Sequence, residues 1–302
     1  MVTKKQNVVN LAQKMRERLN KRTGKETAKS YGEGENLLQV KSWIPLKEFF
    51  KLASGGDGFP CGHITQIIGE PDSGKTTLMM EGMVSCQKEG GVVYLIDSEH
   101  KFSLQRFALM GGVPEDINVI GSDCLEDAWE SIHEICQDIS DIREEGLDFP
   151  VMICWDSIAA SVPNKILEDD SGDAHVAVEA KLNNKNVRKL RQFIKKANVA
   201  VVGINHYYTT MPSPGKPPKD IIKGGEELTF MSTLVVKTKK GKKLERGVLG
   251  ETQQIGRVTK FQIAKGHFHG RTIVKDVFVV DKGILETKED FDAYKKTLKG
   301  DY

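Results

Sequence analysis

The chain has 302 residues, of which 39% are hydrophobic, and a formal net charge of +2. That length allows one large core with small additions, or two domains. No apolar run approaches the roughly 18 residues of a membrane-spanning helix, and the charged N-terminus lacks the apolar segment of a signal peptide. The five cysteines stand singly, without C-x-x-C spacing, which is typical of reduced intracellular thiols. We therefore expect a cytoplasmic protein without membrane association.

The first 40 residues are expected to form a basic helix followed by a linker. Residues 1–30 carry nine Lys and Arg against Glu17 and Glu26, and apolar residues recur at helical spacing over 7–21. A helix of this length is marginal alone, so its apolar side should dock on its own domain or on another subunit. The positive charge suits an anionic partner or a solvated tail equally well.

The region from 41 to 285 alternates between short apolar strands and helices. The expected strands are 64–68, 92–97, 117–120, 151–155 and 199–204, and the expected helices are 75–88, 103–110, 125–145 and 176–197. This pattern predicts an α/β fold with a mostly parallel, twisted sheet covered by helices on both faces. Later strands at 233–238, 257–264 and 274–280 have no helices between them, which predicts an antiparallel extension at one edge. Residues 286–302 should form a short tail.

One stretch carries a specific motif, G-x-x-x-x-G-K-[ST]. Its residues are Gly69, Glu70, Pro71, Asp72, Ser73, Gly74, Lys75, Thr76 and Thr77. A hydrophobic strand enters it and a helix leaves it, which is the context of a phosphate-binding loop. The glycines let backbone N–H groups turn toward phosphate oxygens, and the helix N-terminus adds a positive dipole end. Lys75 would reach the β- and γ-phosphates, and Thr76 would bind Mg²⁺. The alternative is a Gly-rich turn before a helix.

Polar residues follow three of the predicted strands. Because ligands bind at the carboxyl ends of strands in open α/β sheets, these residues are candidates for the same site. Asp156 is placed to hold Mg²⁺ through Thr76 or water. Glu99 would polarise an attacking water, and His206 would sense the γ-phosphate and report it to the following loop. A capping Asp, a turn residue and a structural His remain the respective alternatives.

Two long segments, 161–176 and 207–227, interrupt the alternation of strands and helices. Segments of this length in a compact domain are usually functional or disordered. The helix expected between them carries seven Lys and Arg, opposed only by Glu179. A basic helix beside two loops is typical of a surface that binds nucleic-acid phosphates. A solvated charged face is the alternative.

These motifs occur together in a specific order, and as a set they resemble RecA-type recombinases over roughly 45–285. The set comprises the phosphate loop, Asp97-Ser98-Glu99-His100, Trp155-Asp156-Ser157, Gly172-Asp173-Ala174-His175, Arg188-Lys189-Leu190, Asn205-His206 and Gly224-Gly225. The chain is most similar to the UvsX-like recombinases of large tailed phages. The resemblance implies a RecA-like P-loop ATPase core that uses ATP and Mg²⁺. It also implies helical filaments on single-stranded DNA, pairing with homologous duplex DNA, and a role in recombination and repair in the host cytoplasm.

The resemblance also implies roles for single residues around the nucleotide. Glu99 would be the catalytic carboxylate, acting with Lys75. Arg106 would cover the adenine ring, and His206 stands where bacterial RecA has Gln. Lys265 resembles a lysine that reaches the ATP of the neighbouring subunit, so hydrolysis would require assembly. His267 stands where the family has a second such lysine, which predicts weaker or pH-dependent activation between subunits.

The DNA-binding segments implied by the resemblance are 161–181 and 207–227. The residues expected to contact DNA are Val176, Lys181, Asn184, Arg188, Met211, Gly224 and Gly225. The second segment departs from the family because it contains four prolines. The chain also lacks the C-terminal domain with which bacterial RecA gathers duplex DNA. The N-terminal helix would dock on the next subunit, and single-strand-binding and loader proteins would be further partners.

Two other functions fit some of the same motifs. A ring-shaped helicase of the same superfamily would also hydrolyse ATP on DNA, but it would need an arginine supplied by the neighbouring subunit. A non-catalytic accessory factor would bind DNA under the control of ATP without pairing strands. The complete set Lys75, Thr76, Glu99 and Asp156 argues against such a factor.

Overall fold

The computed structural model describes residues 2–24, 40–167, 175–209, 211, 220–248, 251–267 and 273–298. It divides into two units, Met1–Val40 and Lys41–Tyr302. The first unit contains the helix α1 (Val2–Thr23), on which Leu11, Met15 and Leu19 are exposed. Their spacing places these apolar side chains on one side of the helix, as expected from the sequence. No helix among the described residues is long and apolar enough to cross a membrane.

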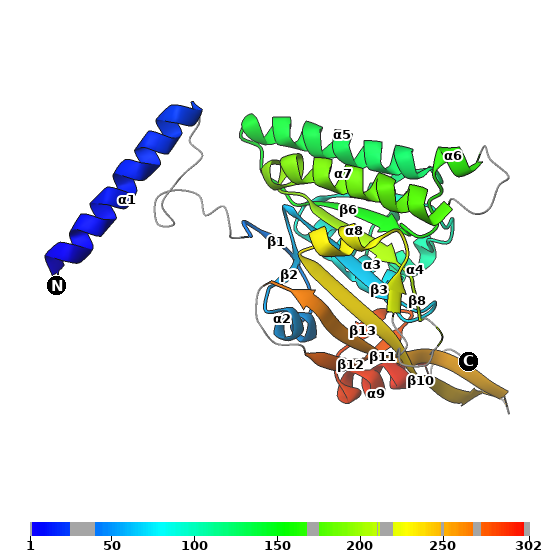
Figure 1. Ribbon diagram of the computed structural model, residues 1–302. Helices are drawn as coiled ribbons and strands as arrows, with labels where there is room; N and C mark the ends of the chain where they lie inside the picture. The colour runs from blue at the N-terminus through cyan, green and yellow to red at the C-terminus, as the bar shows by residue number, and fades with distance from the viewer. Residues whose placement is uncertain are drawn as a thin grey trace. The chain divides into compact units, whose positions relative to one another are not determined.

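The second unit is built on one sheet of nine strands (Figure 1). In spatial order these are β13 (Gly283–Leu285), β12 (Val274–Val280), β11 (Glu251–Gly266), β10 (Leu234–Val248), β3 (His63–Gly69), β7 (Ala200–Asn205), β6 (Val151–Asp156), β4 (Val92–Asp97) and β5 (Ile117–Ile120). Neighbours from β10 to β5 are parallel, and those from β13 to β10 are antiparallel. The predicted parallel sheet with an antiparallel edge extension is confirmed.

Helices cover both faces of the sheet. On one face lie α2 (Glu48–Ser54) and α3 (Lys75–Lys88), and on the other lie α5 (Leu125–Glu144) and α7 (His175–Ala197), which run side by side in Figure 1. Strand β6 packs against the helices on both faces of the sheet. Met152 and Cys154 pack toward α3, whereas Val151, Ile153 and Trp155 pack toward α5 and α7. A strand buried on both faces therefore appears as a continuous apolar run.

Several short elements were not predicted from the sequence. They are β1 (Trp43–Pro45), β2 (Gly58–Pro60), α2, α6 (Asn164–Leu167), β8 (Tyr207–Thr209), β9 (Asp220–Ile222), α8 (Glu226–Met231), β13 and α9 (Lys288–Thr297), whereas α4 (Leu104–Leu109) falls within the expected helix 103–110. Most have three to seven residues, which is too few to establish a periodic pattern. Strands β8 and β9 pair as a hairpin within the predicted 207–227 loop.

The hairpin of β10 and β11 is also longer than expected. The two strands pair from Leu234↔Gly266 to Val248↔Glu251, with three shifts of register on the way. Its distal part is rich in lysine and has few apolar residues, so it lacks the alternation that marks a half-buried strand. Backbone pairing therefore defines most of this extension, while Leu244 and Ile255 pack in a small cluster with α9. The extension runs beyond the helical layers in Figure 1.

Candidate active site

The phosphate loop connects β3 to α3, and its shape is fixed by close packing. A Cβ atom on Gly69 would lie 2.1 Å from Thr238 Oγ1, so only glycine fits there. Gly74 has a φ of 86°, in the left-handed region that glycine adopts readily. Ser73 Oγ donates to the carbonyl of Glu70 at 2.7 Å and lies 2.6 Å from Thr238 Oγ1. These contacts fix the path of the loop between the end of β3 and the start of α3.

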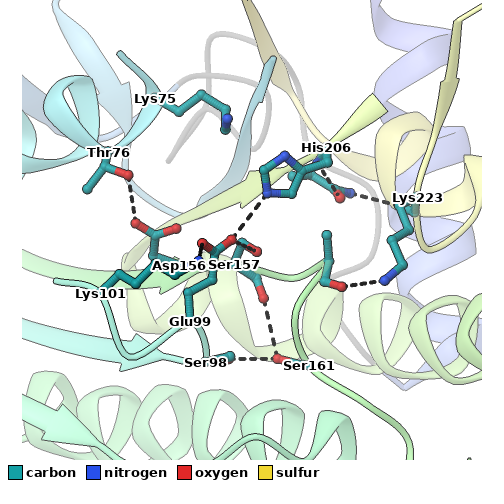
Figure 2. A network of polar contacts seen from close by, with 12 residues as sticks. Lys75, Thr76, Ser98, Glu99, Lys101, Asp156, Ser157, Ser161, His206 and Lys223 are labelled. Carbon is teal, nitrogen blue, oxygen red and sulfur yellow. Dashed lines mark hydrogen bonds and ion pairs between the residues drawn. The ribbon is translucent and has the colours of Figure 1, made fainter. Parts of the chain in front are cut away.

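Lys75 and Thr76, the first residues of α3, face the carboxyl end of β6. Lys75 Nζ donates to the carbonyl of Glu70 at 2.8 Å. Burial lowers the pKa of Lys75, and the neighbouring carboxylates of Asp156 and Glu99 counteract this effect. Thr76 Oγ1 donates to Asp156 Oδ2 at 2.8 Å, as Figure 2 shows. The buried Asp156 carboxyl has its pKa raised to about 6, mainly by burial, although the Thr76 hydrogen bond acts in the opposite direction.

The pair Thr76–Asp156 fits the requirements of Mg²⁺. One hydroxyl and one carboxylate are hard oxygen donors, and Mg²⁺ on nucleotides is usually held by one or two protein ligands together with phosphates and water. A bound cation would also offset the cost of burying the Asp156 charge. The described residues contain no group of three or more His, Cys, Asp or Glu that could hold a metal ion. The donor set therefore suits a nucleotide-bound cation rather than a metal held by protein groups alone.

Glu99 lies after β4 and has three polar neighbours. Ser157 Oγ donates to Glu99 Oε1 at 2.7 Å, His206 Nε2 lies 3.2 Å from the same oxygen, and Lys101 Nζ is 3.6 Å from Oε2. Partial burial would raise the pKa of Glu99. The hydrogen bonds from Ser157 and His206 and the charges of His206 and Lys101 outweigh it and lower that pKa. The side chain therefore stays ionised beside the phosphate loop and is able to accept a proton or orient water.

His206 links Glu99 to the base of the 207–227 segment (Figure 2). Its backbone N–H donates to Asn205 Oδ1 at 2.8 Å, and Asn205 Nδ2 donates to the carbonyl of Lys223 at 2.9 Å. The Lys223 N–H returns a hydrogen bond to the His206 carbonyl at 3.0 Å, and its Nζ donates to the carbonyl of Ala159 at 2.6 Å. One continuous network thus joins Glu99 to the 207–227 segment and to Ala159, two residues before the 161–176 segment.

Most of the phosphate loop, together with Glu99, Asp156 and His206, lines one pocket of about 770 Å³. Arg106 lines it as well: its Nη2 donates to Thr77 Oγ1 at 2.8 Å and to the carbonyl of Val280 at 2.9 Å, and burial lowers its pKa. The pocket brings together Lys75, Thr76, Glu99, Asp156, Arg106 and His206. The nucleotide residues chosen from the sequence therefore meet in one place.

The pocket also has lining residues that the sequence did not single out. They are Lys243, Gln254 and Arg257 from the β10–β11 hairpin, and Val280 and Asp281 at the end of β12. None lies in a motif. Lys243 and Gln254 reach the pocket because the hairpin extends past the expected strand ends, whereas Arg257 begins the expected strand 257–264. Ser157 was also not assigned a role, although its position next to Asp156 at a strand end is a signal that could have indicated one.

Lys265 lies away from this pocket. Its Nζ donates to the carbonyls of Thr229 and Phe230 in α8, at 3.2 and 2.5 Å, and lies 5.4 Å from the centre of the Phe230 ring. Burial lowers its pKa. It lines a second pocket of about 510 Å³, together with β9 and α8. Within its own chain, Lys265 is therefore not a ligand of the nucleotide.

The predicted DNA-contact residues gather around α7 and the start of α8. Lys181 is exposed on α7, and a Cβ on Gly225 would lie 3.0 Å from Ala180 and 3.8 Å from Asn184. Asn183, a neighbour on the same helix, donates to the carbonyl of Gly224 at 2.9 Å. The 207–227 segment thus returns directly onto the helix that follows the 161–176 segment.

Two of the remaining DNA candidates are described, and they differ in their surroundings. Arg188 is paired with Glu227 of α8 at 3.0 Å, whereas Met211 is 91% exposed. The side chain of Val176 and residues 168–174 and 212–219 lie outside the described part of the chain.

Comparison with known proteins gives the same assignment as the site. The family described as RecA N-terminal domain matches residues 10–279. Protein RecA of Campylobacter jejuni subsp. doylei is 31% identical over 247 residues, which make up 82% of this chain and 68% of that protein. The chain therefore belongs to the RecA family, whose members are DNA-dependent ATPases that act in recombination and repair.

Proposed function

We propose that this protein is an ATP-dependent recombinase that assembles as helical filaments on single-stranded DNA and pairs that strand with a homologous duplex. The observation that carries the proposal is the hydrogen-bonded network from Glu99 through His206 and Asn205 to Lys223. It connects a phosphate pocket with the 207–227 segment, which returns onto the basic helix α7. A nucleotide-dependent change at Glu99 therefore has a physical route to a DNA-binding surface.

The phosphate loop and Lys75 would grip the triphosphate, while Thr76 and Asp156 would hold Mg²⁺. The bound Mg²⁺ would neutralise charge on the β- and γ-phosphates. Glu99, kept ionised by its neighbours, would orient the attacking water and accept its proton. His206, which contacts the same Glu99 oxygen, would respond when that oxygen changes partners, and Asn205 and Lys223 would pass the change to the 207–227 segment.

Assembly would complete the site. Lys265 lies away from the nucleotide of its own chain, which supports its predicted role at the ATP of a neighbouring subunit. The exposed Leu11, Met15 and Leu19 of α1 support docking of this helix on the next subunit. We further infer a UvsX-like phage lineage from His206, which stands where bacterial RecA has Gln.

The test is a comparison of wild-type protein with Lys75→Ala in three assays: ATP hydrolysis with and without single-stranded DNA, strand exchange, and electron microscopy of the assemblies. We expect DNA-stimulated hydrolysis, exchange and filaments for the wild type, and loss of hydrolysis and exchange for Lys75→Ala. Lys88→Ala, at the exposed far end of the same helix, is the matched control and should behave as wild type.

Three results would contradict the proposal. Normal strand exchange by Lys75→Ala would remove the phosphate loop from the mechanism. Closed rings that move along DNA would indicate a helicase. ATP-controlled DNA binding without exchange would indicate an accessory factor.

A further inference from the structure

The nucleotide pocket continues past the phosphate loop to a wall made by Arg106, Val280 and Asp281. Arg106 connects the phosphate loop to this wall, because its Nη2 donates both to Thr77 Oγ1 and to the carbonyl of Val280. Thr77 directly follows the residues that would grip the phosphates. If the pocket holds a nucleoside triphosphate, as proposed above, its nucleoside part must extend toward this wall.

Asp281 is oriented in this wall by the C-terminal helix α9. Its Oδ1 accepts hydrogen bonds from the Tyr294 hydroxyl at 2.8 Å and from the backbone N–H of Lys282 at 2.7 Å. The Tyr294 ring is buried beside Phe291 in a small cluster between α9 and the antiparallel edge of the sheet. Burial, then the hydrogen bond to Asp281 and its charge, raise the pKa of Tyr294, so its hydroxyl remains a donor. Asp281 Oδ2 accepts no hydrogen bond from the residues that the structure describes.

The charge of Asp281 limits what it can face. Asp156 and Glu99 already serve the proposed cation and the attacking water, and a carboxylate without a cation repels phosphate. Asp281 is therefore suited to the uncharged part of the nucleotide. As an acceptor without a proton, it needs a donor on the ligand. The Arg106 guanidinium, fixed by its two hydrogen bonds, has the planar shape that covers the face of a base. Asp281, which follows Val280, would then lie at the edge of that base.

We propose that Asp281 accepts a hydrogen bond from the 6-amino group of adenine, and that Tyr294 positions Asp281 for this contact. The site would thus prefer a nucleotide with a donor at that position. A base without the amino group leaves the carboxylate without a partner and loses the hydrogen bond. For a charged acceptor at a solvent-accessible wall, we expect a preference of about tenfold.

The test measures the equilibrium binding of nucleotides to the full-length protein by calorimetry, with Mg²⁺ and without DNA. The probes are ATP, 2′-deoxyATP and purine riboside 5′-triphosphate, which differs from ATP only by the missing amino group. We expect the wild type to bind ATP about tenfold more tightly than the purine analogue. Asp281→Ala should bring the two affinities within about twofold, and Tyr294→Phe, which keeps the ring, should reduce the preference in part.

Two controls make the result specific. Asp276→Ala removes another exposed carboxylate from β12, away from the pocket lining, and should keep the wild-type preference. Lys75→Ala should lose affinity for all three nucleotides, because it removes the phosphate grip that they share.

The outcomes separate this inference from the proposed function. If the wild type binds ATP and the purine analogue equally, or if Asp281→Ala keeps the full preference, the role of Asp281 is wrong while the nucleotide site stands. Asp281→Ala could instead lose only the preference for ATP over 2′-deoxyATP and keep the preference for ATP over the purine analogue. The carboxylate would then contact the ribose, and the assignment to the base would be overturned. If the wild type binds none of the three nucleotides, the proposed function fails as well.

Discussion

Asp156 and Glu99 follow neighbouring strands of the sheet, yet their surroundings give them different chemistry. Asp156 is buried, and burial raises its pKa to about 6. Glu99 is more exposed, and the hydrogen bonds and charges around it lower its pKa in spite of partial burial. A bound cation would stabilise the charged form of Asp156, whereas Glu99 is stable as an anion without one. This difference supports the proposed metal binding by Asp156 and the proposed activation of water by Glu99.

Replacing Glu99 by Gln tests the second assignment. The amide keeps the size of the side chain but accepts a proton poorly, so hydrolysis of ATP should slow by about 10²-fold or more. Nucleotide and DNA affinities should stay close to those of the wild type. Steady-state turnover in the presence of single-stranded DNA measures the effect, with the exposed Glu115→Gln as the control. An unchanged turnover would move the catalytic role to another residue.

Of the described side chains that contact Glu99, His206 is the one that directly precedes the 207–227 segment. His206→Ala removes this contact while leaving the phosphate loop intact. We expect the variant to bind ATP normally. The factor by which ATP raises the affinity for single-stranded DNA should be roughly fivefold or more smaller than in the wild type. Fluorescence anisotropy of labelled DNA, with and without a non-hydrolysable ATP analogue, measures this coupling.

A matched control for that variant lies in the loop after β4. His100 Nε2 is paired with Asp123 at 2.6 Å, so His100→Ala should leave the coupling in place. If His206→Ala keeps the wild-type difference between the two nucleotide conditions, the signal from the pocket does not pass through this histidine.

At the scale of elements, sequence patterns predict the parts of this fold that combine strong periodicity with length. The strands β3, β4, β5, β6 and β7 and the helices α3, α5 and α7 fall within one or two residues of their expected bounds. The phosphate loop and the polar strand ends Glu99, Asp156 and His206 could be predicted for the same reason, because a motif in a strand–loop–helix context fixes its own position in the sheet.

The rest of the site depends on elements with no such signal. Lys243 reaches the pocket from the lysine-rich part of the hairpin, beyond the expected strand, where backbone pairing leaves no trace in side-chain periodicity. Arg257 lies at the start of the expected strand 257–264, but no motif marks it as a site residue. Asp281 lies in the turn after β12, and its orientation depends on Tyr294 thirteen residues later. A contact between distant residues of ordinary types has no local pattern from which it could be inferred.

Helix α9, which was missed, does carry a start signal. Thr287 and Asp290 form a capping box, in which Asp290 N–H donates to Thr287 Oγ1 at 3.1 Å and Thr287 N–H donates to Asp290 Oδ2 at 3.2 Å. Thr287→Ala should lower the free energy of unfolding by about 1 kcal/mol. Thr287→Ser keeps the hydroxyl, so its free energy of unfolding should stay close to that of the wild type. Denaturant titration followed by circular dichroism gives both values. Equal destabilisation by the two variants would show that the cap contributes nothing.

At the scale of the whole molecule, the near-neutral net charge hides a strong separation of charge. Basic residues concentrate in α1, in α7 and along the β10–β11 hairpin, so that acidic residues dominate elsewhere. Each phosphate that a lysine neutralises releases counterions from DNA, so affinity should fall steeply as the salt concentration rises. The slope of that dependence counts the phosphates in contact, which makes it a direct measure of the proposed surface.

Lys181 is the cleanest residue with which to test that surface. It is exposed on α7, whereas Arg188 on the same helix is already paired with Glu227 and must give up that pair before it can bind phosphate. We expect Lys181→Ala to weaken single-stranded DNA binding and to reduce the magnitude of the slope of log K against log salt by about 1. Lys51→Ala, on α2 across the sheet, should leave both quantities unchanged. If both variants lower affinity equally, the attraction reflects overall charge rather than a contact on α7, and the DNA path must be sought elsewhere on the molecule.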